Sequence, residues 1–216
     1  MLILLPPSEG KNQPAGKAQL NLSKLAFADQ LLEVRSRLVS KSLATSPCAK
    51  AIDVYSGVLY QALDWNSLSA TAKARGEKSL LIVSAIFGVL RPSDLIPNYK
   101  AKIKSSDWKA ALKPALDNLA ADLIIDCRSS TYAGVWQAPA DITVAVRVFK
   151  KEKGKISVIT HLSKKYRGEL TRVLLKSGKT PKSPAELLAI AEKHFDCKLI
   201  KAKGNLPWYL DLIINY

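Results

Sequence analysis

Polar side chains that could bind a phosphate or transfer a proton follow two apolar stretches of the chain. Glu9 and Lys11 come after the apolar opening and place a carboxylate and an ammonium on either side of a glycine. Ser129 and Tyr132 lie in a hydroxyl-rich turn after a later apolar stretch. A carboxylate in such a place can act as a general acid or base, and hydroxyls with backbone amides can hold an anion. An ordinary connecting loop and a turn that caps a helix are the simpler explanations.

A third candidate group is Arg91, which follows an apolar run at 80–89. Gly88 beside Phe87 allows a sharp backbone turn, and Pro92 removes a donor, so the strand cannot simply continue. We expect one buried strand here, with Arg91 at its carboxyl end. Open α/β sheets bind ligands at that end of a central strand, and the planar guanidinium suits phosphate or carboxylate. A buried strand that leaves its sheet through a turn is the simpler alternative.

The charge of the chain is strongly positive and unevenly spread. There are 33 basic and 18 acidic residues, which give a net charge of +15. Most of this excess lies between Arg147 and Lys182, where the acidic residues are Glu152 and Glu169. An excess of this size attracts polyanions such as nucleic acid, although a solvated lysine-rich surface would also explain the run in a hairpin turn.

The helix expected at 164–176 is harder to explain as plain surface. It begins with Lys164, Lys165 and Arg167 and continues to Arg172. Cations at a helix N-terminus oppose the helix dipole unless an anion binds there. The segment therefore predicts a phosphate-binding surface.

These groups must be positioned by interleaved strands and helices. We expect strands at 1–5, 80–89, 123–127, 142–149 and 155–160, and helices at 21–43, 47–62, 69–78, 108–121, 164–176 and 183–195. The ending, at 197–200 and 208–216, is apolar enough to pack against the body. Ser106 or Asp107 should cap the fourth helix, and Pro114 should kink it. The pattern predicts a single α/β (or α+β) domain over residues 1–216, with a mixed β-sheet flanked by helices.

Composition excludes several other classes. The content of 48% hydrophobic and 24% charged residues is that of a globular protein. No glycine-rich nucleotide fingerprint occurs, the three cysteines are widely spaced, and His161 is far from His194, so we expect no cofactor, no metal site and no disulfide framework. The apolar opening is too short for a signal peptide or a membrane span, so we expect a cytoplasmic location.

Five short motifs are spread over the whole chain. They are Pro6–Lys11, Tyr55-Ser56-Gly57 with Tyr60, Phe87–Pro92 with Asp94, Leu95 and Tyr99, Ser129 with Tyr132, and Lys164–Gly168 with Arg172. Together they resemble the YaaA family of bacterial peroxide stress proteins. The resemblance implies a cytoplasmic protein that protects against hydrogen peroxide by limiting free iron and oxidative damage. It also implies a basic cleft, a helix-hairpin-helix-like element for DNA and a fold unlike the common enzyme folds.

The chain departs from this family in the turn that contains Phe87, Gly88 and Pro92. Many members carry a glycine at the position of Ala85, which gives the hairpin two glycines. If Ala85 needed a positive φ, the hairpin could not form unchanged.

Two functional hypotheses follow. The first is a stress protein that binds DNA with little sequence preference; the residues expected to hold phosphate are Lys11, Arg91, Ser129, Lys164, Lys165, Arg167 and Arg172. The second is an enzyme that acts on a nucleotide or on a nucleobase in nucleic acid, with Glu9 as acid or base, Lys11, Arg91 and Arg167 on phosphate and Tyr132 orienting the substrate. Its ligand would be a small phosphorylated molecule. Direct iron sequestration is disfavoured, because ligand clusters are missing.

Overall fold

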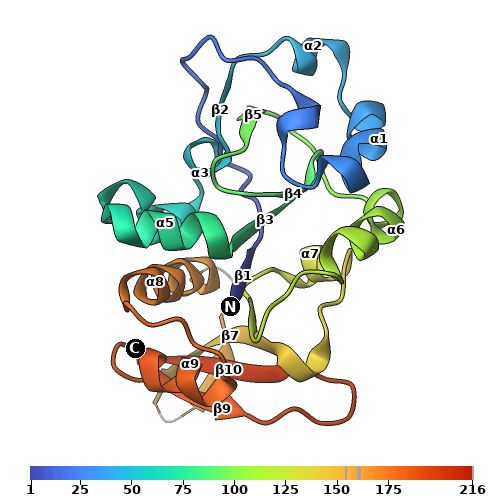
Figure 1. Cartoon of the computed structure of the whole chain (residues 1–216). Helices are drawn as coiled ribbons and strands as arrows, with labels where there is room; N and C mark the ends of the chain where they lie inside the picture. The colour runs from blue at the N-terminus through green and yellow to red at the C-terminus, as the bar shows by residue number, and fades with distance from the viewer. Residues whose placement is uncertain (154, 160–161, 216) are drawn as a thin grey trace.

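A mixed β-sheet runs through the molecule and carries helices on both faces (Figure 1). The computed structural model describes residues 1–153, 155–159 and 162–215. Within these residues the strand order is β4-β3-β1-β6-β7-β10-β9, and β8 pairs with the far part of β7. The strands are β1 (Leu2–Leu5), β3 (Leu80–Ser84), β4 (Gly88–Leu90), β6 (Ile124–Asp126), β7 (Thr143–Glu152), β8 (Lys155–Val158), β9 (Asp196–Ile200) and β10 (Trp208–Asn215).

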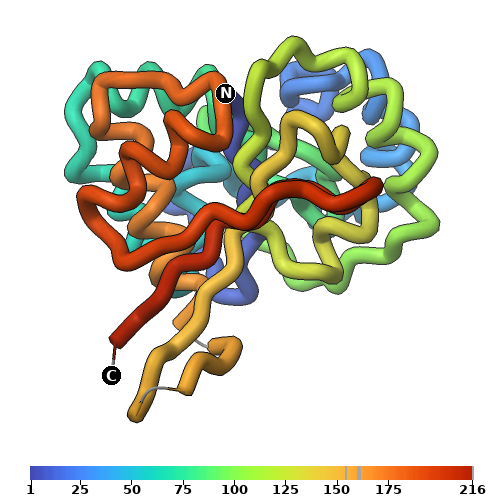
Figure 2. Tube along the Cα trace, turned by 90° about the horizontal axis from the view of Figure 1, so that it is seen from below, coloured from blue at the N-terminus to red at the C-terminus, as the bar shows by residue number. Residues whose placement is uncertain are grey.

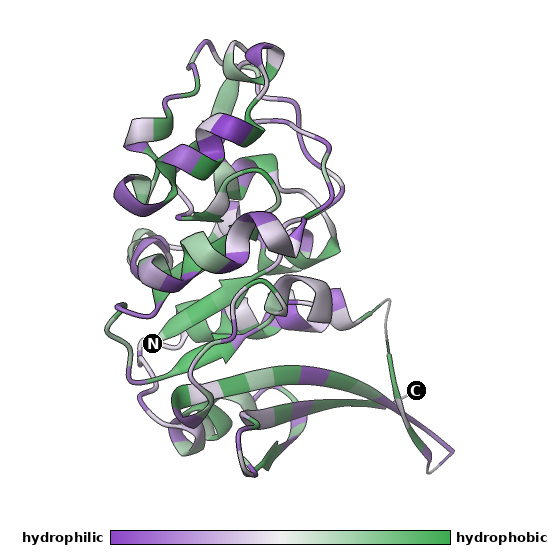
Figure 3. Ribbon diagram, turned by 90° about the vertical axis from the view of Figure 1, so that its right-hand side faces the viewer, coloured by the Kyte–Doolittle hydropathy of each residue, from purple (hydrophilic) through white to green (hydrophobic). Residues whose placement is uncertain are grey.

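The central strands β3, β1, β6, β7 and β10 are parallel, whereas β4, β8 and β9 are antiparallel to their neighbours. Every residue of β1 and β3 is buried, as expected for strands covered on both faces. Figure 3 shows these strands as apolar, with hydrophilic residues on the outer helices and loops. A small separate sheet pairs β2 (Cys48–Lys50) with β5 (Leu95–Pro97). The predicted fold class, a mixed α/β sheet flanked by helices, is confirmed.

Two hydrophobic clusters lie on the two sides of the sheet. On one side Leu4 and Val83 pack with α1 (Ala28–Leu38) and α6 (Ser105–Leu116). On the other side Leu5 and Ile82 pack with a second set of helices. That set is α4 (Val58–Leu63), α5 (Ala70–Ser79), α8 (Ser163–Lys176) and α9 (Pro184–Ala191). Among the described residues, none of the helices is long and apolar enough to span a membrane.

Several predicted elements are confirmed within a few residues. They are the strands at 1–5 and 123–127, the hairpin at 142–160, and the helices at 69–78, 164–176 and 183–195. The apolar segments at 197–200 and 208–216 pack against the body as strands β9 and β10 of the sheet. The turn residue Gly154 of that hairpin, together with Thr160, His161 and Tyr216, lies outside the described residues.

The two long N-terminal helices were predicted wrongly. The first is divided into η1 (Leu22–Lys24), α1 and α2 (Lys41–Ala44), because Phe27 takes a left-handed conformation (φ 61°) and Val39 is extended. The second is divided into β2, α3 (Ala51–Val54) and α4, because the backbone turns extended at Tyr55 to bridge with Lys11. Apolar spacing continues through both breaks, and so does not reveal them.

The run at 80–89 is a hairpin rather than one strand. The Ser84 hydroxyl accepts a hydrogen bond from the Phe87 amide at 3.1 Å, and Gly88 then takes a φ of 72°. A side chain at Gly88 would also lie 2.5 Å from the Trp108 ring. The positive φ falls on Gly88 and not on Ala85, so the alanine is compatible with this turn.

Helix α6 also differs from expectation at both ends. Its N-cap is Lys104, which makes no side-chain cap bond, so the predicted capping by Ser106 or Asp107 is wrong. Pro114 lies in the last turn and the helix ends at Leu116. Proline removes the hydrogen bond to the carbonyl of residue 110, but the Asp117 amide still donates to the Lys113 carbonyl at 2.9 Å, so the helix passes through Pro114 and ends before the expected residue 121. The remaining short helices are α7 (Ser130–Ala133), η2 (Trp65–Ser67) and η3 (Ala140–Ile142).

Candidate functional site

The loops that follow β1, β3 and β6 meet at one edge of the sheet. These strands are parallel, with Leu5 opposite Ile82 and Leu4 opposite Asp126, so their carboxyl ends point the same way. The loops carry Lys11 and Tyr132, as the sequence led us to expect. We call Glu9, Lys11, Tyr55, Tyr60, Tyr99 and Tyr132 the tyrosine–lysine cluster.

The ammonium group of Lys11 rests on two aromatic rings. Its Nζ lies 4.4 Å from the centre of the Tyr99 ring and 5.7 Å from that of Tyr55, and it donates a hydrogen bond to the Ser8 carbonyl at 2.8 Å. Such cation–π contacts favour the charged amine. Burial nevertheless lowers the pKa of Lys11, and the charge of Glu9 opposes this effect.

Buried hydroxyl groups extend the cluster into the protein. The Tyr99 hydroxyl lies 2.8 Å from that of Tyr55 and 2.7 Å from that of Ser84. The Tyr60 hydroxyl donates to the Pro6 carbonyl at 2.8 Å. Burial raises the pKa of Tyr55 and Tyr60 well above the ordinary value and that of Tyr99 to about 12. These phenols are therefore neutral hydrogen-bonding groups at physiological pH, and they hold the rings beneath Lys11 in place.

Glu9 and Tyr132 lie where the cluster reaches solvent. Glu9 is exposed, and Tyr132 is half-buried. Burial, and then the charge of Glu9, raises the pKa of Tyr132. A molecule bound at this edge would meet a carboxylate, an amine and a phenol. These groups are suited to proton transfer or to holding a polar ligand.

Sequence reasoning missed the hydroxyl network of Tyr55, Ser84 and Tyr99, and the Tyr60 hydroxyl that bonds to the Pro6 carbonyl. Tyr55 and Tyr60 flank Gly57, and this spacing was the available signal. Helical spacing predicts one long helix through both tyrosines, whereas the backbone breaks at Tyr55 and places its ring beneath Lys11.

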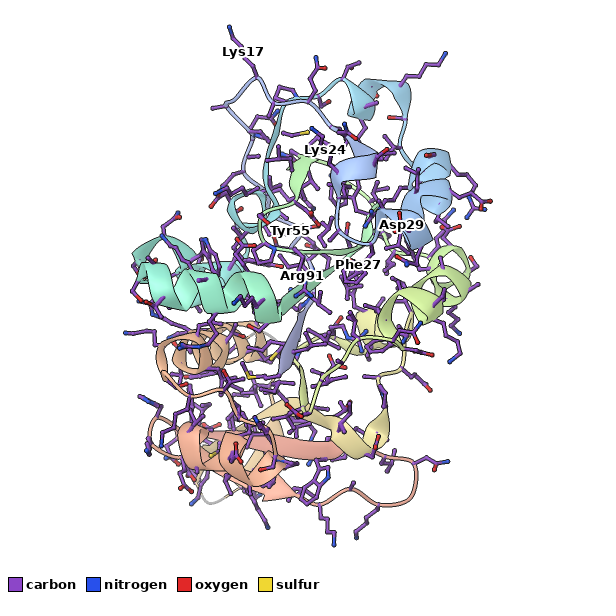
Figure 4. The ribbon with its side chains drawn as sticks, in the orientation of Figure 1. Lys17, Lys24, Phe27, Asp29, Tyr55 and Arg91 are labelled. Carbon is purple, nitrogen blue, oxygen red and sulfur yellow. The ribbon has the colours of Figure 1, made fainter. Side chains whose placement is uncertain are left out.

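Arg91 does not belong to this cluster. It was expected at the carboxyl end of a central strand, but β4 is an antiparallel edge strand, so Arg91 lies at the opposite end of the sheet. Its Nη1 donates to the Lys78 carbonyl at 2.8 Å and to that of Leu80 at 3.3 Å. Its guanidinium lies 5.9 Å from the centre of the Phe27 ring, and Figure 4 labels both residues.

The arginines of α8 are engaged with the protein itself. Arg172 donates to the carbonyls of Leu63 and Asp64 at 3.0 and 2.8 Å, which caps the end of α4. Arg167 donates to the Val146 carbonyl at 2.9 Å.

The lysines at the start of α8 behave differently. Lys164 is exposed, and so is Lys165, whose Nζ lies 3.7 Å from a Glu169 carboxylate oxygen. Ser129 precedes α7 as its N-cap without a side-chain cap bond. Of the expected phosphate-binding residues, Arg91 thus lies apart, whereas Lys11 and Ser129 both lie in loops at the carboxyl edge of the parallel strands. The basic cleft and the helix-hairpin-helix-like element stay predictions.

Fold and site define a mixed α/β domain with an amine held on tyrosine rings at the carboxyl edge of its parallel strands. Residues 27–199 match the family described as "Peroxide stress protein YaaA", and the chain belongs to this family. The resemblance found in the motifs is therefore confirmed.

Relatives match over nearly the whole chain. A UPF0246 protein of Streptomyces coelicolor is 32% identical over 259 aligned positions, which cover 100% of this chain and 99% of the relative. A UPF0246 protein of Corynebacterium glutamicum is 34% identical over 231 positions, covering 89% and 92% of the two chains. An uncharacterized protein of Campylobacter jejuni is 27% identical over 242 positions, covering 94% and 96%.

Proposed function

We propose that this protein acts in the cytoplasm in the response to peroxide stress and binds DNA through its phosphates, with little sequence preference. The family supports the stress role. The net charge of +15 supports a polyanionic partner. In this proposal DNA binding limits oxidative damage, and the protein also helps to limit free iron.

The observation that carries the DNA proposal is the set of exposed lysines near the start of α8. Lys164 and Lys165 are exposed there, and Lys151, Lys153 and Lys155 are exposed in the preceding β7–β8 hairpin. Arg167 and Arg172 donate to backbone carbonyls, so we assign the phosphate contacts mainly to the lysines. Lysine side chains on flexible stems suit sequence-independent contacts with phosphate.

Salt dependence of binding tests this proposal. We expect the affinity of the wild-type protein for duplex DNA to fall by about 10³-fold or more between low and moderate salt, because bound phosphates release counterions. The variant Lys164→Ala/Lys165→Ala should bind more weakly, and its slope of log affinity against log salt should be smaller by about 2. Fluorescence anisotropy with a labelled duplex measures both.

The matched control is Lys17→Ala/Lys24→Ala, which removes the same charge. Both lysines are exposed and lie in the upper part of the molecule, away from α8 (Figures 1 and 4). Equal losses in the two double variants, or a wild-type affinity indifferent to salt, would contradict the proposed contact surface.

The tyrosine–lysine cluster favours a second candidate function, an enzyme that acts on a nucleotide or a nucleobase. Lys11 is held at a strand end beside a carboxylate and a phenol, and DNA binding alone requires no such grouping. Glu9 would be the acid or base, and Lys11 would hold a phosphate of the substrate. A small phosphorylated molecule is the ligand class in this case.

Glu9→Gln separates the two functions. Loss of the Glu9 charge should lower the pKa of Lys11 further, because that charge now raises it. A larger neutral fraction of the amine should then speed its acetylation at pH 8, which peptide mass spectrometry detects. DNA affinity should stay the same or rise slightly, whereas any turnover should be lost.

The control for this substitution is Glu33→Gln, at an exposed position of α1. Acetylation of Lys11 at the wild-type rate in Glu9→Gln would show that Glu9 does not act on the amine.

A further inference from the structure

One face of the sheet is covered by helices over only half of its width. Helices α1 and α6 pack on the side of Leu4 and Ile124, over β3, β1 and β6. Thr143 pairs with Ile124, so this side continues along β7 through Ala145, Arg147 and Phe149. The opposite side of β7 instead packs under α8 and α9.

The pairing of the neighbouring strands brings further side chains to the same face. On β10, Tyr209 lies opposite Ala145 and Ile213 opposite Phe149, and on β9 Ile200 lies opposite Tyr209. Directly paired residues share a face of the sheet. In the part of the chain that the structure describes, neither buried cluster includes Phe149, Tyr209, Ile200 or Ile213. We call these four residues with Arg147 the open sheet face.

The β7–β8 hairpin extends this face beyond the body of the protein, beside the end of β10 (Figure 2). Val158 lies opposite Phe149 and Ile156 opposite Lys151, and these two apolar side chains are 70% and 58% exposed. Apolar side chains so far in solvent indicate a surface that receives a partner.

An arginine holds the two aromatic rings of the face in a fixed arrangement. The Arg147 guanidinium lies 4.2 Å from the centre of the Tyr209 ring and 5.4 Å from that of Phe149. Asp211 holds this guanidinium by two hydrogen bonds, of 2.6 and 2.7 Å. The Arg147 side chain is 40% exposed, and Phe149 and Tyr209 are half-buried, so all three flat groups are partly exposed beside one another.

Lysines surround the open sheet face at both ends. Lys151, Lys153 and Lys155 are exposed in the hairpin, and Lys198, Lys201 and Lys203 are exposed on β9 and after it. Asp211 is neutralised by Arg147. Asp196 lies on the edge strand opposite Ile213 and is outnumbered by these lysines. The charge therefore complements a polyanion.

We propose that the open sheet face binds single-stranded DNA. Its bases stack on Phe149, Tyr209 and the Arg147 guanidinium, and the surrounding lysines hold its phosphates. Aromatic rings with nearby cations bind single strands in this way without sequence preference. A duplex keeps its base faces inside the helix and cannot use these rings. The proposal rests on the proposed DNA binding, and it adds that this face selects single-stranded over duplex DNA.

The test compares a fluorescent 15-mer of thymidine with a 15-base-pair duplex, using Phe149→Leu and Tyr209→Leu. Leucine keeps an apolar side chain but removes the ring. Each variant should lose about 5-fold or more of its affinity for the single strand, the loss of one stacked base, and should keep its duplex affinity. The control Phe195→Leu changes a half-buried aromatic packed in the cluster under α8 and α9. Denaturation midpoints check that all variants are folded.

If both variants bound the single strand as tightly as the wild-type protein does, and also kept their duplex affinity, the stacking proposal would be overturned and the proposed function would stand. Failure of the wild-type protein to bind either probe would overturn both. Sedimentation gives the oligomeric state of each protein. If the wild-type protein were a dimer and Tyr209→Leu a monomer, the face would be an interface between two copies, and the proposal would also be overturned.

Discussion

Replacing Arg35 with methionine should lower the free energy of unfolding by about 3–5 kcal/mol, the cost typical of removing one member of a buried charged network. Arg35 lies on α1 and is completely buried. Its Nε donates to the Phe87 carbonyl at 3.0 Å, and its Nη2 donates to those of Ala26 and Val89 at 2.8 and 2.9 Å. Methionine fills part of the volume but removes the donor from the buried Phe87 and Val89 carbonyls and from the part-buried Ala26 carbonyl.

The charges around Arg35 also predict that Arg35→Met is less stable than the wild-type protein. Burial lowers the pKa of Arg35 to about 10, and the charge of Asp94 opposes this effect. Loss of the cation would leave the Asp94 carboxylate, itself buried, with less compensation. Urea denaturation followed by tryptophan fluorescence measures the change.

Arg37→Met is the matched control for this substitution. Arg37 lies on the same helix, its side chain is 64% exposed, and its ion pair with Asp107 spans 3.5 Å. Its loss should change the stability by no more than about 0.5 kcal/mol. If the two variants were equally stable, the hydrogen bonds of Arg35 would not hold the β3–β4 hairpin to α1 as described.

The second large effect is expected for Gly168→Ala, where α8 crosses α4. A side-chain carbon at position 168 would overlap the Leu59 carbonyl oxygen and lie 2.9 Å from the Ala62 Cβ. The obstacle is helix backbone, which cannot rotate away, so the helices must separate. We expect a loss of about 1–3 kcal/mol, as for other overpacked cores, despite the better helix propensity of alanine.

Gly16→Ala provides the comparison for Gly168→Ala. The nearest atom to a side chain at Gly16 is the Cys48 carbonyl oxygen at 3.8 Å, an ordinary contact. This variant should unfold at nearly the wild-type urea concentration. A Gly168→Ala protein of wild-type stability would mean that the two helices tolerate a wider separation.

Separation of these helices would also reach the candidate site. Tyr60 lies on α4 and donates to the Pro6 carbonyl in the loop that carries Lys11. Arg172 on α8 caps the other end of α4. Loss of both contacts would loosen the loop beneath the ammonium, so Gly168→Ala should also alter the acetylation rate of Lys11.

The sequence by itself determined the buried strands, the amphipathic helices of the C-terminal half and the hairpin at 142–160. These elements carry strong local signals, such as the wholly apolar Leu2–Leu5 and the Ser69 cap, whose hydroxyl accepts from the Ala72 amide. It also determined the family, through motifs that extend over the whole chain. The pairing of Glu9 and Lys11 in a loop with Tyr132 nearby followed from their positions after strands of a parallel sheet.

The tertiary structure alone decided where the arginines act. Arg91 and Arg172 have the same chemistry as a phosphate-binding arginine, but the antiparallel return of β4 and the crossing of α8 over α4 place them against backbone carbonyls. Arg35 showed no signal in sequence, because its partners Phe87 and Val89 are more than fifty residues away. Every residue has a backbone carbonyl that can accept a hydrogen bond from an arginine. The sequence therefore does not reveal which arginines bond to the protein's own carbonyls and which cations can bind a ligand; the fold decides this.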